Sequence, residues 1–166
     1  MKRRTLLVSC TALLLSFGVW QSGASAATSH HVTWTVHGPY SCVGPCATAT
    51  DFSVKGNAHA DSKDLGEMRY TGAGTVLDYD PATNCLIQSE TYAFTTQNGK
   101  DTINLQTISD TFCFTDDPNS SIETAAFTIT GGTGRFAGAT GSGTFQLGVL
   151  THPQKGSGTF IADISY

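Results

Sequence analysis

Hydrophobic and polar residues alternate along most of this chain, and the alternation has the period of a β-strand. Val32, Trp34 and Val36 alternate with polar neighbours, and so do Phe52 and Val54. A period of two places successive side chains on opposite faces, so each run predicts a strand with one buried face. Helical periodicity is nearly absent. Eight runs rich in Thr, Val, Ile, Phe and Tyr are predicted strands: 31–37, 49–59, 68–79, 85–96, 101–114, 122–130, 141–150 and 156–165.

The connections between these runs are mostly short and carry turn residues, as at Pro39, Asp80-Pro81 and His152-Pro153. Sequential strands with short connections favour an antiparallel up-and-down barrel, which closes on itself and leaves no exposed edge. A sandwich of two sheets is the alternative. Eight strands are also the number whose interior can hold one small ligand. The sequence therefore predicts an all-β protein that folds as an eight-stranded antiparallel up-and-down barrel.

The first 26 residues have the three-part plan of a secretory signal peptide. Residues 2–4 form a basic start, an apolar run follows, and residues 24–26 form a small-residue cleavage site. The apolar run is about fifteen residues long, whereas a membrane-spanning helix needs about 20. We therefore expect a signal peptide over 1–26, a single secreted, extracytoplasmic barrel domain over 27–166, and no membrane span.

The domain that follows the expected cleavage site is acidic. The whole chain has nine Lys and Arg against thirteen Asp and Glu, and three of the basic residues lie in the first 26 positions. The remaining charge is six minus thirteen, or −7, which argues against nucleic acid and anionic membranes as partners. The five histidines form no acid-bracketed cluster, so we expect no metal and no cofactor. An oligomer stays open, although no sequence patch requires one.

The cysteines of the domain predict two disulfides, because an even number in an exported domain is typical of a disulfide framework. The four are Cys42, Cys46, Cys85 and Cys113. The first two form an obvious local loop, which leaves the last two to pair. A two-residue turn at 98–99 pairs residues whose numbers sum to 197, and that register puts this second pair on opposite faces. A three-residue loop centred on the glycine at 99 gives 198, the sum of 85 and 113, and sets them opposite each other. We prefer the second register, with that glycine left-handed or with an equivalent bulge.

The preferred register gathers polar side chains on one face of this hairpin. Glu90 and Tyr92 share that face with Gln106 and Asp110. If the face points inward, these four side chains line the lumen, and buried acids are typical of functional sites. The alternative is that the face points outward and the acids are solvated. Trp34 is a further aromatic residue that either lines a cavity or simply fills the core.

The stretch ITGGTGRFAGATGSGTF, at 129–145, is rich in glycine and raises the question of nucleotide binding. A dinucleotide-binding loop needs a helix next and an acidic residue about 20 positions further on. Here more glycine and another strand follow, so a structural use is favoured. We expect Arg135 and Phe136 to form a short turn, with Phe136 closing one barrel end and Arg135 reaching a carboxylate or carbonyl.

The same stretch resembles the signature of the allene oxide cyclase-like barrel family, which includes dirigent proteins. The residues that carry the resemblance are Gly131, Gly132, Gly134, Phe136 and Gly138. The resemblance implies a secreted, bacterial-type member of this family. Members of the family are eight-stranded barrels with a hydrophobic cavity. Plant cyclases of the family close a fatty-acid epoxide into a cyclopentenone, and dirigent proteins orient phenoxy radicals. The resemblance transfers no catalytic residue, because the catalytic residues of those proteins lie outside this motif.

Three functions follow from these patterns. The first is a secreted barrel that binds a small apolar molecule in its lumen, oriented by polar groups such as Glu90, Tyr92, Gln106 and Asp110. The second is a cyclase or isomerase acting on a reactive lipid-like or phenolic substrate, with Glu90 or Asp110 as acid or base. The third is a packed structural or cell-surface barrel without a ligand. An enzyme needs buried acids at a cavity, a binding protein needs only the cavity, and a structural protein needs neither.

Overall fold

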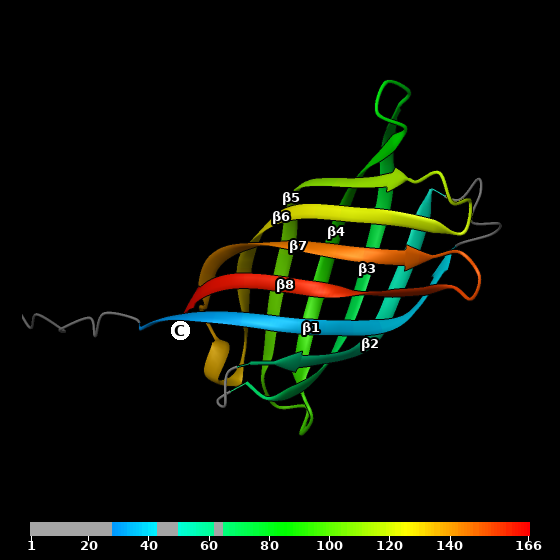
Figure 1. The fold of residues 1–166 in the computed structure, drawn as a ribbon. Coiled ribbons are helices and arrows are strands. Elements are labelled where there is room, and N and C mark those ends of the chain that lie inside the picture. Colours follow the sequence, from blue (N-terminus) through cyan, green and yellow to red (C-terminus); the bar gives the residue numbers. More distant parts are fainter. Residues whose placement is uncertain (1–27, 43–49, 62–64) are drawn as a thin grey trace, which may run out of the picture.

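A computed structural model describes residues 28–42, 50–61 and 65–166 of this chain. Eight antiparallel strands form a closed barrel in which each strand pairs with its neighbours in sequence (Figure 1). The strands are β1 (Ser29–Cys42), β2 (Asp51–Ala60), β3 (Glu67–Asp80), β4 (Cys85–Thr96), β5 (Thr102–Phe114), β6 (Ser120–Thr133), β7 (Thr140–Leu150) and β8 (Lys155–Ser165). A single turn of 3₁₀ helix, η1 (Gly134–Phe136), lies between β6 and β7. The predicted barrel is confirmed, and the sandwich is wrong because β1 pairs with β8 and closes the sheet.

Two predictions fall on residues outside the described ranges. The expected signal peptide over 1–26 is one of them, and the Cys42–Cys46 disulfide is the other, since Cys46 is not among the described residues. Both stay predictions. No helix among the described residues has the length and apolar character needed to cross a membrane.

Strand β1 extends further than its alternation predicted. The sequence placed a turn at Pro39, but the strand continues through it to Cys42. Pro39 lies opposite Lys155 of β8, whereas the pairing of β1 with β2 passes from His37 to Tyr40 without it. A proline has no N–H to donate, so a strand tolerates it where one neighbouring strand requires no hydrogen bond.

The register of β4 and β5 changes along the hairpin, and both signals found in the sequence are therefore correct locally. Near the turn Thr95 lies opposite Thr102, a sum of 197, whereas Cys85 lies opposite Cys113, a sum of 198. The shift falls between Ile87 and Thr91 of β4. The equivalent bulge that the sequence allowed is confirmed, and the glycine at 99 has the expected left-handed φ of 74°.

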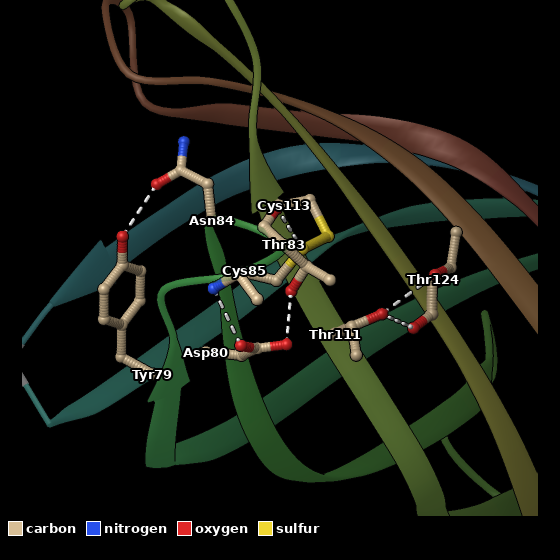
Figure 2. The surroundings of a disulfide bond; sticks show 9 residues. Tyr79, Asp80, Thr83, Asn84, Cys85, Thr111, Cys113 and Thr124 are labelled. Atoms are coloured by element: carbon tan, nitrogen blue, oxygen red, sulfur yellow. Dashed lines mark hydrogen bonds between the residues drawn. A yellow bond between two sulfur atoms is a disulfide. The ribbon is translucent and has the colours of Figure 1, made fainter.

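The Cys85–Cys113 disulfide is confirmed, and its two Cα atoms lie 4.0 Å apart (Figure 2). The figure also shows the turn that precedes β4. Asp80 Oδ1 accepts a hydrogen bond from the backbone N–H of Ala82 at 2.9 Å, and its Oδ2 accepts one from Thr83 Oγ1 at 2.7 Å. Residues 80–83 therefore form a turn that is stabilised by its own side chains.

The strands enclose two halves that differ in their filling. The closed half is the end at which β6 leads into η1, and the open half is the end at which the Cys85–Cys113 disulfide lies. Trp34, Phe94 and Phe160 are fully buried in the closed half, with ring centroids 5.1 Å apart for Trp34–Phe94 and 5.3 Å for Phe94–Phe160. Burial of such large side chains is the main source of stability in a small barrel.

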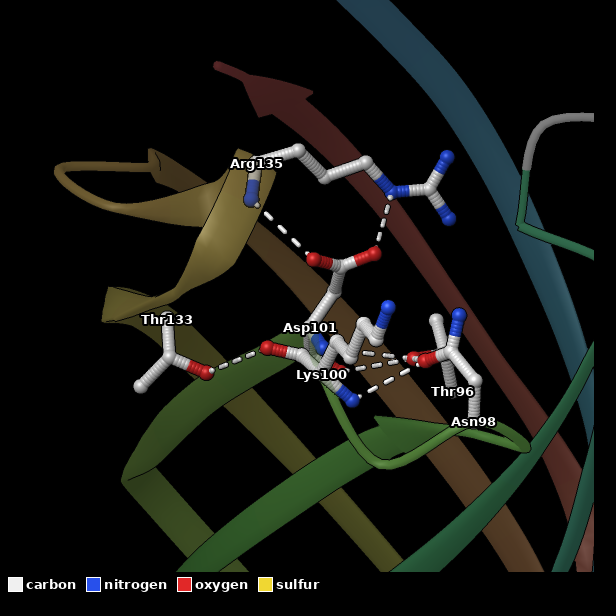
Figure 3. Close-up of polar contacts among 6 residues, drawn as sticks. All are labelled: Thr96, Asn98, Lys100, Asp101, Thr133 and Arg135. Atoms are coloured by element: carbon white, nitrogen blue, oxygen red, sulfur yellow. Dashed lines mark hydrogen bonds and ion pairs between the residues drawn. The ribbon is translucent and has the colours of Figure 1, made fainter.

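The glycine-rich stretch forms the short turn that the sequence predicted, and Figure 3 shows the polar contacts around it. Gly134 has a φ of 60°, and a Cβ there would lie 2.0 Å from Asp101 Oδ1, so only glycine fits. Arg135 donates its backbone N–H to Asp101 Oδ1 at 3.2 Å, and its Nε lies 3.3 Å from Oδ2. Phe136 is fully buried and meets Tyr166 edge to face at 4.7 Å. The stretch is structural, with an aromatic plug held by an ion pair.

Candidate functional site

The open half of the barrel contains a cavity of about 350 Å³. This volume lies within the range of about 300–1,000 Å³ that is typical of ligand sites. The apolar wall includes Phe52, Val54, Leu86, Phe112, Leu147 and Val149. Polar groups enter the wall chiefly at Tyr70, Gln88, Tyr92 and Glu123. The lumen is therefore not packed throughout its length.

Three carboxyl groups meet inside the barrel, and we call them the carboxyl cluster: Glu90 on β4, Asp110 on β5 and Glu123 on β6. Their exposed fractions are only 2%, 1% and 6%. One oxygen of each lies within 4.8 Å of one oxygen of each of the others. Three acids on adjacent strands at this depth are unusual, because an ionised carboxylate is costly to bury without a partner.

A bulge in β5 brings the cluster together. Thr107 and Asp110 are three residues apart and would lie on opposite faces of a regular strand, yet both are buried. Between them Ile108 and Ser109 are both exposed, and the pairing of β5 with β6 passes from Thr107 to Ser109. The bulge turns Asp110 inward and also lets Thr107 Oγ1 accept a hydrogen bond from the backbone N–H of Glu90 at 2.7 Å.

The hydrogen bonds of the cluster are incomplete. The Tyr92 hydroxyl donates to Glu90 Oε2 at 2.5 Å. Neither oxygen of Asp110 accepts a hydrogen bond from a described residue, and neither does Glu123 Oε1. Gln88 Nε2 is likewise buried without a described acceptor. Buried polar atoms are normally paired, and the acids of the cluster are close enough to pair with one another when one of them holds a proton.

Burial favours the neutral forms of the three acids. It raises the pKa of Asp110 to about 8, with a further contribution from the charge of Glu90. Burial also raises the pKa of Glu123 well above its usual range, and the charges of Glu90 and Asp110 add to this. The pKa of Glu90 is raised by burial too, although hydrogen bonds from its neighbours oppose the rise. The cavity therefore has one acid of the cluster, Glu123, in its wall and the other two behind it. In its neutral form such an acid can donate as well as accept a hydrogen bond.

The cluster alone does not form a complete metal site. Its three oxygens are close enough to contact one ion, but Ca²⁺ takes six to eight oxygen ligands. The Tyr92 hydroxyl donates its proton to Glu90, so this proton points toward the cluster. The expectation of no metal and no cofactor stays a prediction.

The structure brings together three of the predicted site residues. Glu90, Tyr92 and Asp110 all point inward, as the inward alternative required. Tyr92 lines the cavity, whereas Glu90 and Asp110 lie behind its wall. Gln106 is a correction: it lies opposite Thr91 on the outer face. The register shift moved it out of the lumen, and Leu105 takes the inward position opposite Tyr92 instead.

Trp34 and Glu123 are the other two residues for which the structure differs from the prediction made from the sequence. Trp34 is buried against Phe94 in the closed half, and it is not among the described residues that line the cavity. Glu123 was missed, although it does line the cavity. The alternation of β6 could have revealed it, because Glu123 shares the buried face with Ala125 and Phe127. An acid on an otherwise apolar strand face is a candidate functional residue.

Comparison with known proteins identifies the fold but no activity. No family model matches the sequence, and no curated protein does. A solved structure of a pterocarpan synthase dirigent protein is similar, with a TM-score of 0.53 and 15% sequence identity. The match covers 98% of this chain and 99% of that one. This chain has a dirigent-like barrel fold. At this identity the likeness concerns the fold alone, and the dirigent-like barrel expected from the glycine motif is confirmed to that extent.

Proposed function

We propose that this chain is an exported barrel protein that binds one small, largely apolar molecule in the cavity of the open half. The observation that carries the proposal is the cavity itself, with its apolar wall and a few polar groups. Small-molecule sites typically combine such walls with a small number of convergent polar groups. Tyr70, Tyr92 and Glu123 line the cavity and would orient the ligand.

Export is supported by two independent features. The first 26 residues have the pattern of a signal peptide. The Cys85–Cys113 disulfide joins β4 to β5, and disulfides persist mainly in oxidising compartments. Native mass spectrometry of protein purified from its own host's secretions would test this: we expect cleavage after residue 26 and a mass four hydrogens below the reduced chain. A reduced or uncleaved protein would contradict export.

Binding of the neutral, fluorescent probe Nile red tests the cavity directly. Val149 and Leu150 are neighbours on β7 whose side chains point to opposite faces of the strand. Val149 lines the cavity, whereas Leu150 is 43% exposed. We expect saturable binding to the wild type, a loss of at least about tenfold in Val149→Trp, and no change in Leu150→Trp. Melting temperatures of both variants would establish that they fold. No saturable binding, or equal binding by both variants, would disprove the proposal.

A cyclase or isomerase is the second candidate, and the protonated cluster favours it. An acid whose pKa is about 8, as that of Asp110 is, can donate a proton near neutral pH. Glu123 lines the cavity and would pass that proton to a substrate. An isomerisation needs no external oxidant.

Turnover assays with lipid epoxides and phenolic substrates would decide between the two candidates. We expect Asp110→Asn and Glu123→Gln to lower the rate by about 10²-fold or more if the acids catalyse, while Nile red affinity is retained. Absence of turnover by the wild type, together with tight Nile red binding, would leave the binding function alone.

A further inference from the structure

The strongly ionisable groups in and behind the cavity wall are all acids. No Lys, Arg or His side chain is among the described residues that line the cavity, and none is among the buried polar residues. Three carboxyl groups are buried there without a cationic partner. Buried acids are usually paired with a base, because an isolated carboxylate loses its solvation. A ligand with a basic, cationic group could supply the partner that these acids lack.

We propose that the ligand of this cavity is an organic cation, an amine with an apolar body whose ammonium group binds at Glu123. The inference rests on the proposed binding function and specifies the chemical class of the ligand. Glu123 is the member of the carboxyl cluster that lines the cavity, and its Oε1 has no described hydrogen-bond partner. An ammonium group is a donor with three protons, so it can satisfy such an acceptor.

Two tyrosine rings complete the environment of the cation. Tyr70 and Tyr92 both line the cavity, and their ring centroids are 6.5 Å apart. A cation within about 6 Å of an aromatic face is attracted by the ring. The apolar wall beyond them, formed by residues such as Leu147 and Val149, suits an alkyl or aryl body. A carboxylate ligand, by contrast, would meet acids and no base.

Cation binding and loss of protons from the cluster are linked. In the ligand-free barrel burial favours the neutral acids, whereas an ammonium group beside Glu123 favours the carboxylate. Binding therefore releases protons and tightens as pH rises, until the amine itself loses its charge near pH 10.4, the ordinary pKa of an alkyl ammonium. The titratable groups that face this region are Tyr40 on β1, Tyr70 on β3, Glu90 and Tyr92 on β4, Asp110 on β5 and Glu123 on β6.

Three probes of equal length isolate the headgroup: octylamine, 1-octanol and octanoate, each displacing Nile red at pH 7.5. We expect octylamine to bind at least about tenfold more tightly than 1-octanol, and octanoate to bind most weakly. If 1-octanol binds as well as octylamine, the cation inference is wrong and the proposed binding function survives. If octanoate binds most tightly, the inference is also wrong. If none of the three displaces bound Nile red, the cation inference is wrong, whereas saturable Nile red binding still supports the proposed binding function.

Matched variants separate the buried acid from the general negative charge of the protein. Glu123→Gln should bring octylamine and 1-octanol to within about threefold of each other. Asp163→Asn removes one negative charge from the exposed outer face and should leave the preference unchanged. Equal effects of the two variants would show long-range attraction only and would overturn the site.

A fixed-charge probe keeps the test decisive if Glu123→Gln does not fold. Octyltrimethylammonium carries its charge at every pH, so any change in its affinity reports the protein's own groups. We expect its affinity for the wild type to rise at least about tenfold between pH 5 and pH 8.5, while that of 1-octanol stays constant. A flat profile for the cation would overturn the inference.

Discussion

The two halves of this barrel are made of the same eight strands but are filled in opposite ways. In the closed half, large aromatic side chains fill the lumen, and Phe160 meets both Phe94 and Tyr92 at 5.3 Å. In the open half the lumen contains a cavity of about 350 Å³, with Glu123 in its wall and the other two acids of the carboxyl cluster behind it. The difference shows that alternation decides which face is inside, whereas residue size and polarity decide whether the inside is a core or a site.

The strands of the open half are also less regular. Register shifts occur there between Val76 and Asp78 on β3 and between Thr107 and Ser109 on β5, whereas the closed half has one among the described pairings, between Asn104 and Leu105 on β5. Small residues accompany them: Gly74 lies opposite Glu90, and a Cβ there would lie 2.8 Å from Glu90 Cγ. The nearest atom to that Cβ would be in the Phe52 ring, at 2.4 Å, so the glycine makes room for both the ring and the acid. Bulges and glycines weaken a sheet locally, and the open half combines them with its polar side chains.

The largest difference between the halves should appear on truncation of an aromatic residue in each. Phe160→Ala removes a fully buried ring and should lower the free energy of unfolding by about 3–5 kcal/mol. Phe112→Ala removes a partly buried ring that lines the cavity, and a loss of about 1–2 kcal/mol is expected. Urea denaturation of both variants measures this. Equal losses would show that the closed half is not the main source of stability.

The disulfide is expected to compensate for the looser packing of the open half. Cys85 and Cys113 are 28 residues apart, and the bond joins β4 to β5 beside the cavity. Replacing both by serine should lower the free energy of unfolding by about 2–5 kcal/mol, because the unfolded chain gains freedom. Thermal melting of the double variant, with reduced wild-type protein as the control, provides the measurement. An unchanged melting temperature would contradict a stabilising role.

Sequence reasoning predicted the closed half better than the open half, and the reason is regularity. The alternation in β1 placed Val32, Trp34 and Val36 inside, where all three are buried. In β5 the bulge at Ile108 interrupts the alternation, and the segment contains no glycine or proline to signal it. A constant register therefore placed Gln106 in the lumen, although the structure puts it on the outer face.

The candidate site was predictable only in part. Asp110 was found because the cysteine pairing fixed its register on the disulfide side of the bulge, and Glu90 because it alternates regularly with Tyr92 and Phe94 in β4. Glu123 follows the same rule of alternation within its own strand, but no covalent constraint drew attention to β6. The cavity itself depends on how side chains of all eight strands fill the lumen, and one sequence pattern cannot supply that information.

The pH dependence of stability should distinguish the carboxyl cluster of the open half from the apolar core of the closed half. The pKa of Asp110 rises from 3.8 to about 8 on folding, so between these values the folded protein holds a proton that the unfolded chain releases. The stabilisation is complete below about pH 4 and is lost as pH rises through about 8. Each unit of pKa shift corresponds to about 1.4 kcal/mol, and coupling to the neighbouring acids spreads the effect.

We therefore expect the wild type to become less stable as pH rises from 4 to 8, and Asp110→Asn to flatten that profile by about 2 kcal/mol. Urea denaturation at several pH values measures both profiles. The matched control is Asp116→Asn, which changes an exposed acid in the turn after β5 and should leave the slope unchanged. A stability that increases with pH over this range would contradict the buried, neutral cluster.

The smallest effect should come from the surface of the closed half, at the ion pair that holds the aromatic plug. The side chains of Arg135 and Asp101 are 40% and 20% exposed, and exposed ion pairs contribute only about 0.2–1 kcal/mol. Arg135→Ala should therefore cost less than about 1 kcal/mol, and 1 M NaCl should reduce the difference from the wild type further. Urea denaturation at both salt concentrations measures it. A salt-insensitive loss above about 2 kcal/mol would mean that Arg135 stabilises the closed half by packing over the Phe136 ring, 4.8 Å away, and not by charge.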